Sequence, residues 1–218
     1  MPNPSVHAFA EKVAIVTGVE TPIGRAIAIQ LALNGAFVVS VSDSDEGEVA
    51  VRGLLELGTL ASHIKVDAAS NAGASRVADD LRTRFGRIDL LVNVIFDRPV
   101  PQVETESANS GNLLGEPLTS LADLMEGRPS PRIVSVAIRR DSAPSFKDWF
   151  EGFVRESAEL LGSRFRSNGI LVSGSSVNVD DGELLRERNG ADADDVARIA
   201  MFFLSGESKA VNGQVLMV

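Results

Sequence analysis

The side chains available for chemistry in this chain are restricted. No cysteine and no tyrosine occur among its 218 residues, and the only histidines are His7 and His63. Disulfides, thiol nucleophiles, thiolate metal sites and histidine-rich metal centres are therefore excluded. His63, at the start of an expected strand, is most simply a surface or packing residue. Acid–base work is left to lysine, carboxylate and aliphatic hydroxyl groups.

A glycine-bearing loop after the first apolar segment is the clearest candidate for a phosphate-binding turn. Residues 13–16 are apolar, and residues 17–24 then read TGVETPIG. A helix is expected over 22–34, with Thr21 as its N-cap and Pro22 at its first position, where a missing N–H costs nothing. A strand, a glycine turn and a helix N-terminus together form a usual pyrophosphate cradle. By itself this pattern is common and indicates only a weak preference for such a ligand.

Short apolar, β-branched runs alternate with longer segments of helical period, which is typical of βαβ units and a parallel sheet. The length suits one α/β domain, and 44% apolar residues are enough for a full core. We expect a single α/β domain over residues 1–218, with 1–11 as a tail and helices on both faces of a doubly wound parallel sheet. The seven expected strands cover 13–16, 37–41, 63–66, 89–92, 132–136, 170–172 and 214–217, and the expected helices cover 22–34, 46–57, 72–85, 147–166 and a segment that begins near Asp192.

Charge and hydropathy exclude several classes of partner. Thirty acidic residues against 21 basic ones give a formal charge of −9, whereas nucleic acids and anionic membranes require a basic face. No apolar run approaches the ~20 residues of a membrane span, and residues 1–12 lack the pattern of a secretory signal. We therefore expect a cytoplasmic protein that binds neither nucleic acid nor membrane.

The loop at 17–24 resembles that of the short-chain dehydrogenase/reductase (SDR) superfamily, which has the form TGxxxGxG. Gly18 and Gly24 match two of the loop glycines. Asp67 lies where the family's aspartate holds the adenine, and Asn93 matches the first residue of the family's NNAG segment. The resemblance extends over nearly the whole chain. It implies a Rossmann-like fold and a site for a nicotinamide dinucleotide.

Three departures from the family pattern weaken the expected dinucleotide site. Pro22 replaces the second loop glycine, which adds a ring and removes an N–H where the backbone should approach the pyrophosphate. Glu20 places a carboxylate beside an anionic ligand, and two charges ~5 Å apart at an effective dielectric constant of ~20 repel by about 3 kcal/mol. Residues 94–96 (VIF) replace small residues and fill space for the adenosine half. We expect dinucleotide binding to be weak or lost.

For any dinucleotide that does bind, the end of the second strand favours NAD over NADP. Ser42 and Asp43 lie at that end, and no Arg or Lys occurs between positions 37 and 51. An acidic residue there accepts a hydrogen bond from the ribose 2′-hydroxyl and repels a 2′-phosphate. Asp43 is therefore the candidate ribose ligand.

The resemblance also identifies the family's catalytic positions, and two of them carry unsuitable side chains. Asn112 matches the catalytic asparagine and Lys147 the catalytic lysine. Ile138 occupies the serine position and Ala143 the tyrosine position, and neither can donate a proton or a hydrogen bond. A general acid contributes about 10²–10⁴-fold and an oxyanion donor about 10²–10³-fold, so we expect little hydride chemistry of the family type. Asn112 and Lys147 would then be vestigial.

Plainer roles remain open for several of these residues. Lys147 is equally an ordinary residue near a helix start, Asn112 a structural hydrogen-bonding group, and Asp67 a loop-capping carboxylate. Ser142 and Ser145 flank the tyrosine position and could replace the lost hydroxyl. A serine without an activating base is nevertheless a weak acid at neutral pH.

The retained features belong to the scaffold and to assembly. An apolar stripe runs along the 147–166 helix, and a second stripe marks the helix that begins near Asp192. In the resembling family, these helices and the final strand contribute to the interfaces of a tetramer. Relatives usually continue past the last strand, whereas this chain ends at Val218. Such stripes are first of all core, so the interfaces follow from the resemblance alone.

The favoured interpretation is a catalytically inactive SDR-fold subunit in a hetero-oligomer with a catalytically intact partner of the same fold. Hetero-oligomeric relatives suggest a partner that oxidises a hydroxyacyl-CoA with NAD. One alternative is an active NAD-dependent oxidoreductase whose proton relay uses Lys147 with Ser142 or Ser145. A second alternative is a binding module for a nucleotide or an acyl ligand.

Overall fold

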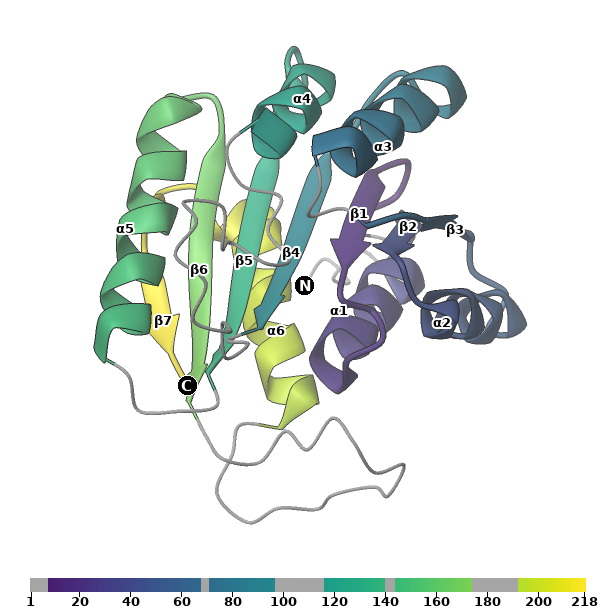
Figure 1. Ribbon diagram of the computed structural model, residues 1–218, viewed down its shortest axis with the longest axis horizontal. Coiled ribbons are helices and arrows are strands. Elements are labelled where there is room, and N and C mark those ends of the chain that lie inside the picture. The colour runs from purple at the N-terminus through teal and green to yellow at the C-terminus, as the bar shows by residue number, and fades with distance from the viewer. Residues whose placement is uncertain (1–7, 68–70, 97–115, 140–143, 174–191) are drawn as a thin grey trace, which may run out of the picture.

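Seven parallel strands form one sheet in the order β3-β2-β1-β4-β5-β6-β7 (Figure 1). The computed structural model describes residues 8–67, 71–96, 116–139, 144–173 and 192–218. The strands are Val13–Thr17 (β1), Phe37–Ser42 (β2), Ala61–Lys65 (β3), Leu90–Phe96 (β4), Arg132–Arg139 (β5), Arg166–Ser173 (β6) and Val215–Met217 (β7). The helices are Pro22–Leu33 (α1), Asp45–Glu56 (α2), Asn71–Arg84 (α3), Glu116–Met125 (α4), Pro144–Leu160 (α5), Ala193–Leu204 (α6) and the short 3₁₀ turn Gly206–Ser208 (η1). The expected doubly wound α/β domain is confirmed.

Helices cover both faces of the sheet, which explains why the strands are apolar almost throughout. On one face, α1 and α6 pack side by side against residues such as Val16, Val92 and Val136. On the other face, α3 and α4 cover residues such as Ile15 and Leu91, while α5 covers Ile95 and Leu171. Consecutive strand residues therefore alternate between two separate apolar layers.

Local capping chemistry sets the helix starts that lead into the candidate site. Thr21 is the N-cap of α1, its Oγ1 accepts a hydrogen bond from Gly24 N (2.9 Å), and Pro22 occupies the first turn, as the sequence predicted. Asp192 is the N-cap of α6. Its carboxylate accepts from Asp194 N (3.4 Å).

The bounds predicted for the helix over 147–166 are wrong at both ends. Helix α5 starts earlier, at Pro144, and stops at Leu160. Gly162 follows with φ +72°, a conformation that glycine adopts without a steric penalty, and the chain enters β6 at Arg166. The strand expected over 170–172 is longer, and it begins at Arg166, the last residue assigned to the expected helix.

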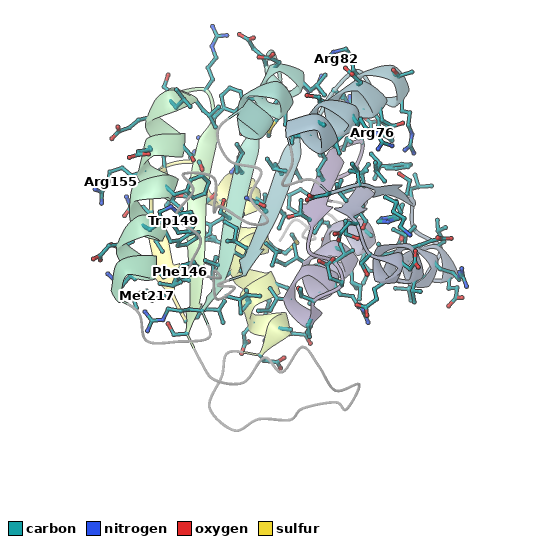
Figure 2. All side chains as sticks on the ribbon, in the orientation of Figure 1. Arg76, Arg82, Phe146, Trp149, Arg155 and Met217 are labelled. Atoms are coloured by element: carbon teal, nitrogen blue, oxygen red, sulfur yellow. The ribbon has the colours of Figure 1, made fainter. Side chains whose placement is uncertain are left out.

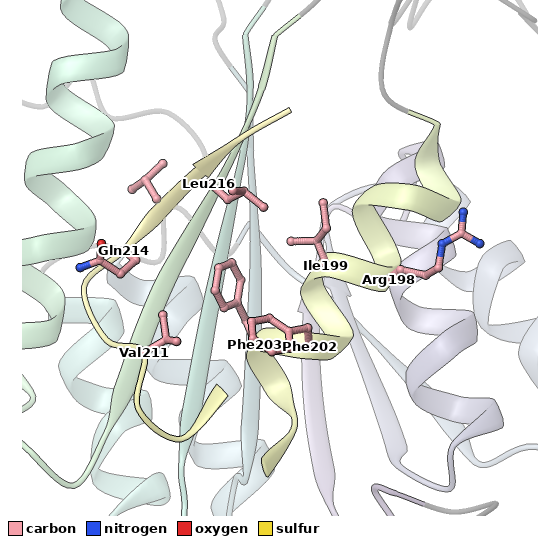
Figure 3. Close-up of a pocket in the computed structure, with 8 residues that line it drawn as sticks. Arg198, Ile199, Phe202, Phe203, Val211, Gln214 and Leu216 are labelled. Carbon is pink, nitrogen blue, oxygen red and sulfur yellow. The ribbon is translucent and has the colours of Figure 1, made fainter. Parts of the chain in front are cut away.

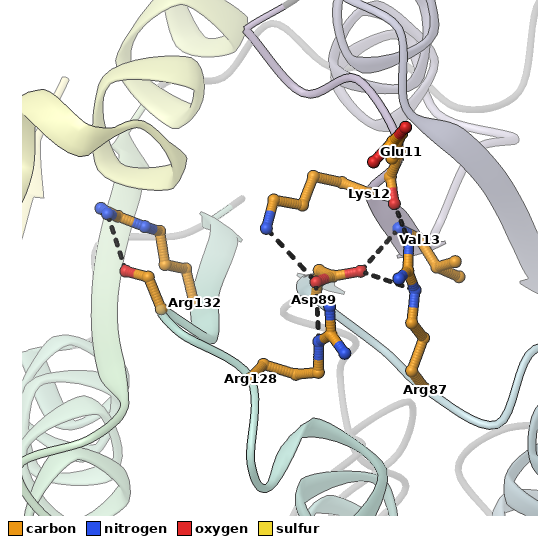
Figure 4. A network of polar contacts seen from close by, with 8 residues as sticks. Glu11, Lys12, Val13, Arg87, Asp89, Arg128 and Arg132 are labelled. Atoms are coloured by element: carbon orange, nitrogen blue, oxygen red, sulfur yellow. Dashed lines mark hydrogen bonds and ion pairs between the residues drawn. The ribbon is translucent and has the colours of Figure 1, made fainter.

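A buried carboxylate ties β1 to β4 at the amino edge of the sheet (Figure 4). Asp89 is 1% exposed, and its Oδ2 accepts a hydrogen bond from Val13 N (3.0 Å). Arg128 Nε lies 3.1 Å and Lys12 Nζ 3.4 Å from Oδ1, while Arg87 Nε lies 3.5 Å from Oδ2. These cations offset the desolvation of the buried charge. The two central strands are thereby held together at the end opposite the candidate site.

Candidate active site

The sheet reverses its winding between β1 and β4, so their carboxyl ends border the crevice where α/β proteins of this kind bind ligands. The Gly18 loop follows β1, and Asn93 lies in β4. Of the residues singled out from the sequence, Asn112, Ser142 and Ala143 lie outside the described residues. Ser145 belongs to α5, and its side chain is also outside the description.

Thr17 and Asn93 form the polar contact at the mouth of this crevice. Thr17 Oγ1 donates a hydrogen bond to Asn93 Oδ1 (3.2 Å) and accepts one from Val94 N (3.0 Å). Thr17 is 6% exposed and Asn93 is 2% exposed. Both side chains are thus used in holding β1 against β4. Sequence reasoning identified Asn93 but gave no separate role to the threonine of the loop motif.

The Gly18 loop is compact and satisfies its own polar groups. Gly18 has φ +68°, and its carbonyl oxygen accepts hydrogen bonds from Thr21 N (3.0 Å) and Thr21 Oγ1 (2.7 Å). A Cβ on Gly24 would lie 2.1 Å from the same carbonyl oxygen. Both positions therefore require glycine, one for its backbone conformation and the other for the close approach of α1 to the loop.

Val94 packs directly against this loop from the neighbouring strand. A Cβ on Gly18 would lie 2.8 Å from Val94 Cβ and 3.2 Å from its Cγ1. Ile95 points to the opposite face and packs in the apolar cluster that contains Phe150 of α5. Of residues 94–96, which we expected to fill the crevice together, Val94 is the described side chain that lies beside Gly18.

The acidic residues expected to bind adenosine lie at the ends of β2 and of the edge strand β3. Asp43 follows β2 and Asp67 follows β3, and both are exposed. Lys65 forms an ion pair with Asp45 at the start of α2, which lowers the pKa of Asp45 and raises that of Lys65. The structure thus places a cation, Lys65, at this edge of the sheet, although no Arg or Lys occurs in the sequence between positions 37 and 51. Asp45 engages that cation.

At the carboxyl end of β5 lies Ile138, which the resemblance matches to the family's serine, and its surroundings are apolar. Ile138 is 2% exposed and lies in the apolar core shared with α1 and α6. Its neighbours in register are Phe96 of β4 and Val172 of β6. This end of the strand is therefore packed as core.

Lys147 lies in the first turns of α5 and pairs with a residue of its own helix. Its Nζ is 2.7 Å from Glu151 Oε1, and both side chains are 34% exposed. The hydrogen bond that Lys147 donates to Glu151 is the main reason that the pKa of Lys147 is raised, and the ammonium is charged at neutral pH. Sequence reasoning missed Glu151, although a spacing of four residues on a helix is the usual signal for such a pair.

Within the ranges given above, no group of three or more His, Cys, Asp or Glu side chains could hold a metal ion. No helix of the described part is long and apolar enough to cross a membrane.

Comparisons with known proteins agree with this geometry. Residues 12–107 match the family model for short chain dehydrogenase. The 1,6-dihydroxycyclohexa-2,4-diene-1-carboxylate dehydrogenase of Acinetobacter baylyi is 35% identical over 89 residues, which are 41% of this chain and 34% of that protein. Short-chain dehydrogenase/reductase FrzI of a Cladobotryum species is 29% identical over 195 residues, 82% of this chain and 74% of that protein. Several curated relatives, the first of these included, are matched over only about a third of their own length.

The structural likeness is more extensive than the sequence match. A 7α-hydroxysteroid dehydrogenase complexed with NADH and 7-oxo glycochenodeoxycholic acid superposes with a TM-score of 0.81 at 25% identity, covering 100% of this chain and 96% of that one. The fold and the glycine loop therefore define a Rossmann-like α/β protein. Over residues 12–107 the chain is similar to short chain dehydrogenases, and its fold is similar to that of solved dehydrogenases over nearly its whole length.

Proposed function

We propose that this chain is a catalytically inactive SDR-fold subunit that supports a catalytically intact partner of the same fold. The observation that carries the proposal is Ile138, a buried hydrocarbon side chain at the family's serine position. The chain also contains no tyrosine at any position. A dinucleotide would supply the hydride, but reduction of a carbonyl also needs a proton donor and a group that stabilises the developing oxyanion. The residues at the matched positions provide neither.

Lys147 supports the same interpretation. In the family that this chain resembles, the matching lysine assists the tyrosine. Here its ammonium is bound by Glu151, one helical turn along α5. With an alanine at the tyrosine position, the lysine has no phenol whose pKa it could lower. Asn112 and Lys147 are then vestigial, and so are the cofactor positions Gly18, Gly24, Asp43, Asp67 and Asn93. Any dinucleotide bound here would be held weakly, with NAD preferred over NADP.

The surface formed by α6 and β7 is the proposed docking surface for the partner (Figure 3). A groove of about 500 Å³ lies between these elements, and its lining is almost wholly apolar. Phe202 is 41% exposed and Leu216 is 44% exposed. Strand β7 is also an edge of the sheet. An exposed apolar edge strand beside an apolar groove is typical of a protein–protein interface.

The test is reconstitution. We expect co-expression with a catalytically complete SDR of the same organism to give a mixed oligomer, seen by native mass spectrometry, in which only the partner binds NAD firmly. The first candidate is a partner that oxidises a hydroxyacyl-CoA. A stable homo-oligomer that ignores every such partner would contradict the proposal.

An active oxidoreductase is the second candidate, because the curated relatives are named as dehydrogenases and reductases. It requires a relay through Lys147 and Ser142 or Ser145. NAD(H)-dependent turnover by the purified chain, abolished by Lys147→Ala, would establish it. Saturable binding of a nucleotide or acyl ligand without turnover or partner would instead indicate a binding module.

A further inference from the structure

The N-terminus of α1 has few backbone donors left for a phosphate. A helix leaves its first four N–H groups without intrahelical partners, and these groups bind anions in phosphate cradles. Here Thr21 N donates to Gly18 O (3.0 Å), Pro22 has no N–H, and Gly24 N donates to Thr21 Oγ1 (2.9 Å). Among the described residues, the remaining donor of the four without a recorded partner is Ile23 N.

The space around these donors is also occupied. Pro22 is exposed, so its ring stands on the surface of the loop that a phosphate would approach. Val94 is 4% exposed and closes the β4 side of Gly18, so near that a Cβ placed on Gly18 would lie only 2.8 Å from Val94 Cβ. A pyrophosphate needs several converging donors and close approach of the backbone. The residues present do not fit this group.

We infer that Pro22 and Val94 are the residues that exclude the pyrophosphate of a dinucleotide from this chain. The inference deepens the proposed function, and its biological meaning rests on that proposal. A subunit without a cofactor would depend on its partner for hydride transfer. Its physical basis is independent of catalysis, because neither residue is at a catalytic position.

The experiment measures binding and not activity. NADH is titrated into the full chain and into four variants: Pro22→Ala, Pro22→Gly, Val94→Ala and the double variant Pro22→Gly/Val94→Ala. Binding is followed by the heat released in calorimetry and by fluorescence energy transfer from Trp149, the single tryptophan. The unaltered chain should show no saturable binding up to millimolar NADH. Pro22→Ala restores one N–H and should tighten binding at least about tenfold, and the double variant about a hundredfold.

Val92→Ala is the matched control. Val92 lies on the same face of β4 as Val94, is fully buried and loses the same two methyl groups, but is two residues further from the loop. It should loosen the core without a gain in NADH binding. Thermal melts show which variants are folded. Because Pro22 is exposed, its variants should fold, and they test the inference even if Val94→Ala unfolds the chain.

Two results would overturn the inference. One is binding of NADH by the unaltered chain with a micromolar Kd. The other is that the Pro22 variants and the double variant all fold but bind NADH no more tightly than the unaltered chain. Binding without turnover would leave the inactive-subunit proposal intact. Turnover by the purified chain would instead remove that proposal, so the two failures are distinguishable.

Discussion

Thr17 Oγ1 and Asn93 Oδ1 are joined by a buried hydrogen bond of 3.2 Å across the point where the sheet reverses its winding. The same hydroxyl accepts a hydrogen bond from Val94 N (3.0 Å). One side chain at the end of β1 therefore fixes the position of β4 beside the glycine loop. The pair has a structural role that is independent of any cofactor.

The first prediction concerns this hydroxyl. Thr17→Val keeps the shape of the side chain but leaves Val94 N without its acceptor and Asn93 without its donor. Unsatisfied buried groups of this kind cost about 1–3 kcal/mol, so the free energy of unfolding in urea should fall by that amount. Thr83→Val is the control, because the Thr83 hydroxyl is exposed and bonds Asp79 O on α3. A loss of equal size in both variants would contradict the assignment.

The second prediction compares two glycines in helices. Gly24→Ala places a Cβ 2.1 Å from Gly18 O, so the loop or α1 must shift, and overpacking of this kind costs about 1–3 kcal/mol. Gly53 lies in α2, and a Cβ there meets nothing within 4 Å. Gly53→Ala should therefore stabilise the protein by about 0.5–1 kcal/mol. Thermal unfolding should show opposite signs for the two variants, and a harmless Gly24→Ala would show that the close approach is not needed.

The third prediction is a pH dependence centred on His63. Its Nδ1 lies 3.1 Å from Ser40 Oγ, and its ring lies against Gly47 of α2. Burial lowers the pKa of His63, and Lys65 adds to this effect, whereas Ser40, Glu48 and Asp45 oppose it. The pKa of His63 in the folded state therefore lies below its unfolded value of about 6.5.

The sign follows from proton linkage. The unfolded chain takes up the proton first as pH falls, so this contribution to stability is fully present above about pH 7 and is lost as pH falls toward the folded pKa. Urea unfolding from pH 7 to 5 should show a shallower loss of stability for His63→Gln than for the unaltered chain. An unchanged slope would mean that His63 does not titrate differently on folding.

The fourth prediction concerns the α6–β7 surface. Phe202→Glu places a charge in the apolar groove. It should weaken association with the catalytically intact partner subunit at least about tenfold, as measured by sedimentation. Leu57→Glu is the control, because Leu57 is 56% exposed and follows α2, far along the chain from the groove. Equal association by both variants would remove this surface from the proposal. Circular dichroism should show that both variants remain folded.

Local sequence rules predicted much of the fold because they depend on neighbouring residues. The N-cap Thr21 with Pro22 is confirmed, since capping needs only residues three apart. Strands β1, β2 and β5 are confirmed as well, because apolar β-branched runs are buried on both faces of a parallel sheet. The predicted end of the helix that became α5 was wrong, because apolar residues on both sides of Gly162 did not show where the helix stops and β6 begins.

The sequence by itself determined which side chains are available: the chain has no tyrosine, and Ile138 and Ala143 occupy the positions that the resemblance matches to the family's serine and tyrosine. Only the tertiary structure decided that Val94 faces Gly18 while Ile95 faces α5. Adjacent strand residues point to opposite faces, so a pattern of two large side chains cannot assign either one to the crevice. The hydrogen bond between Thr17 and Asn93 likewise joins residues 76 positions apart, and it exists because parallel strands distant in sequence become neighbours in the sheet.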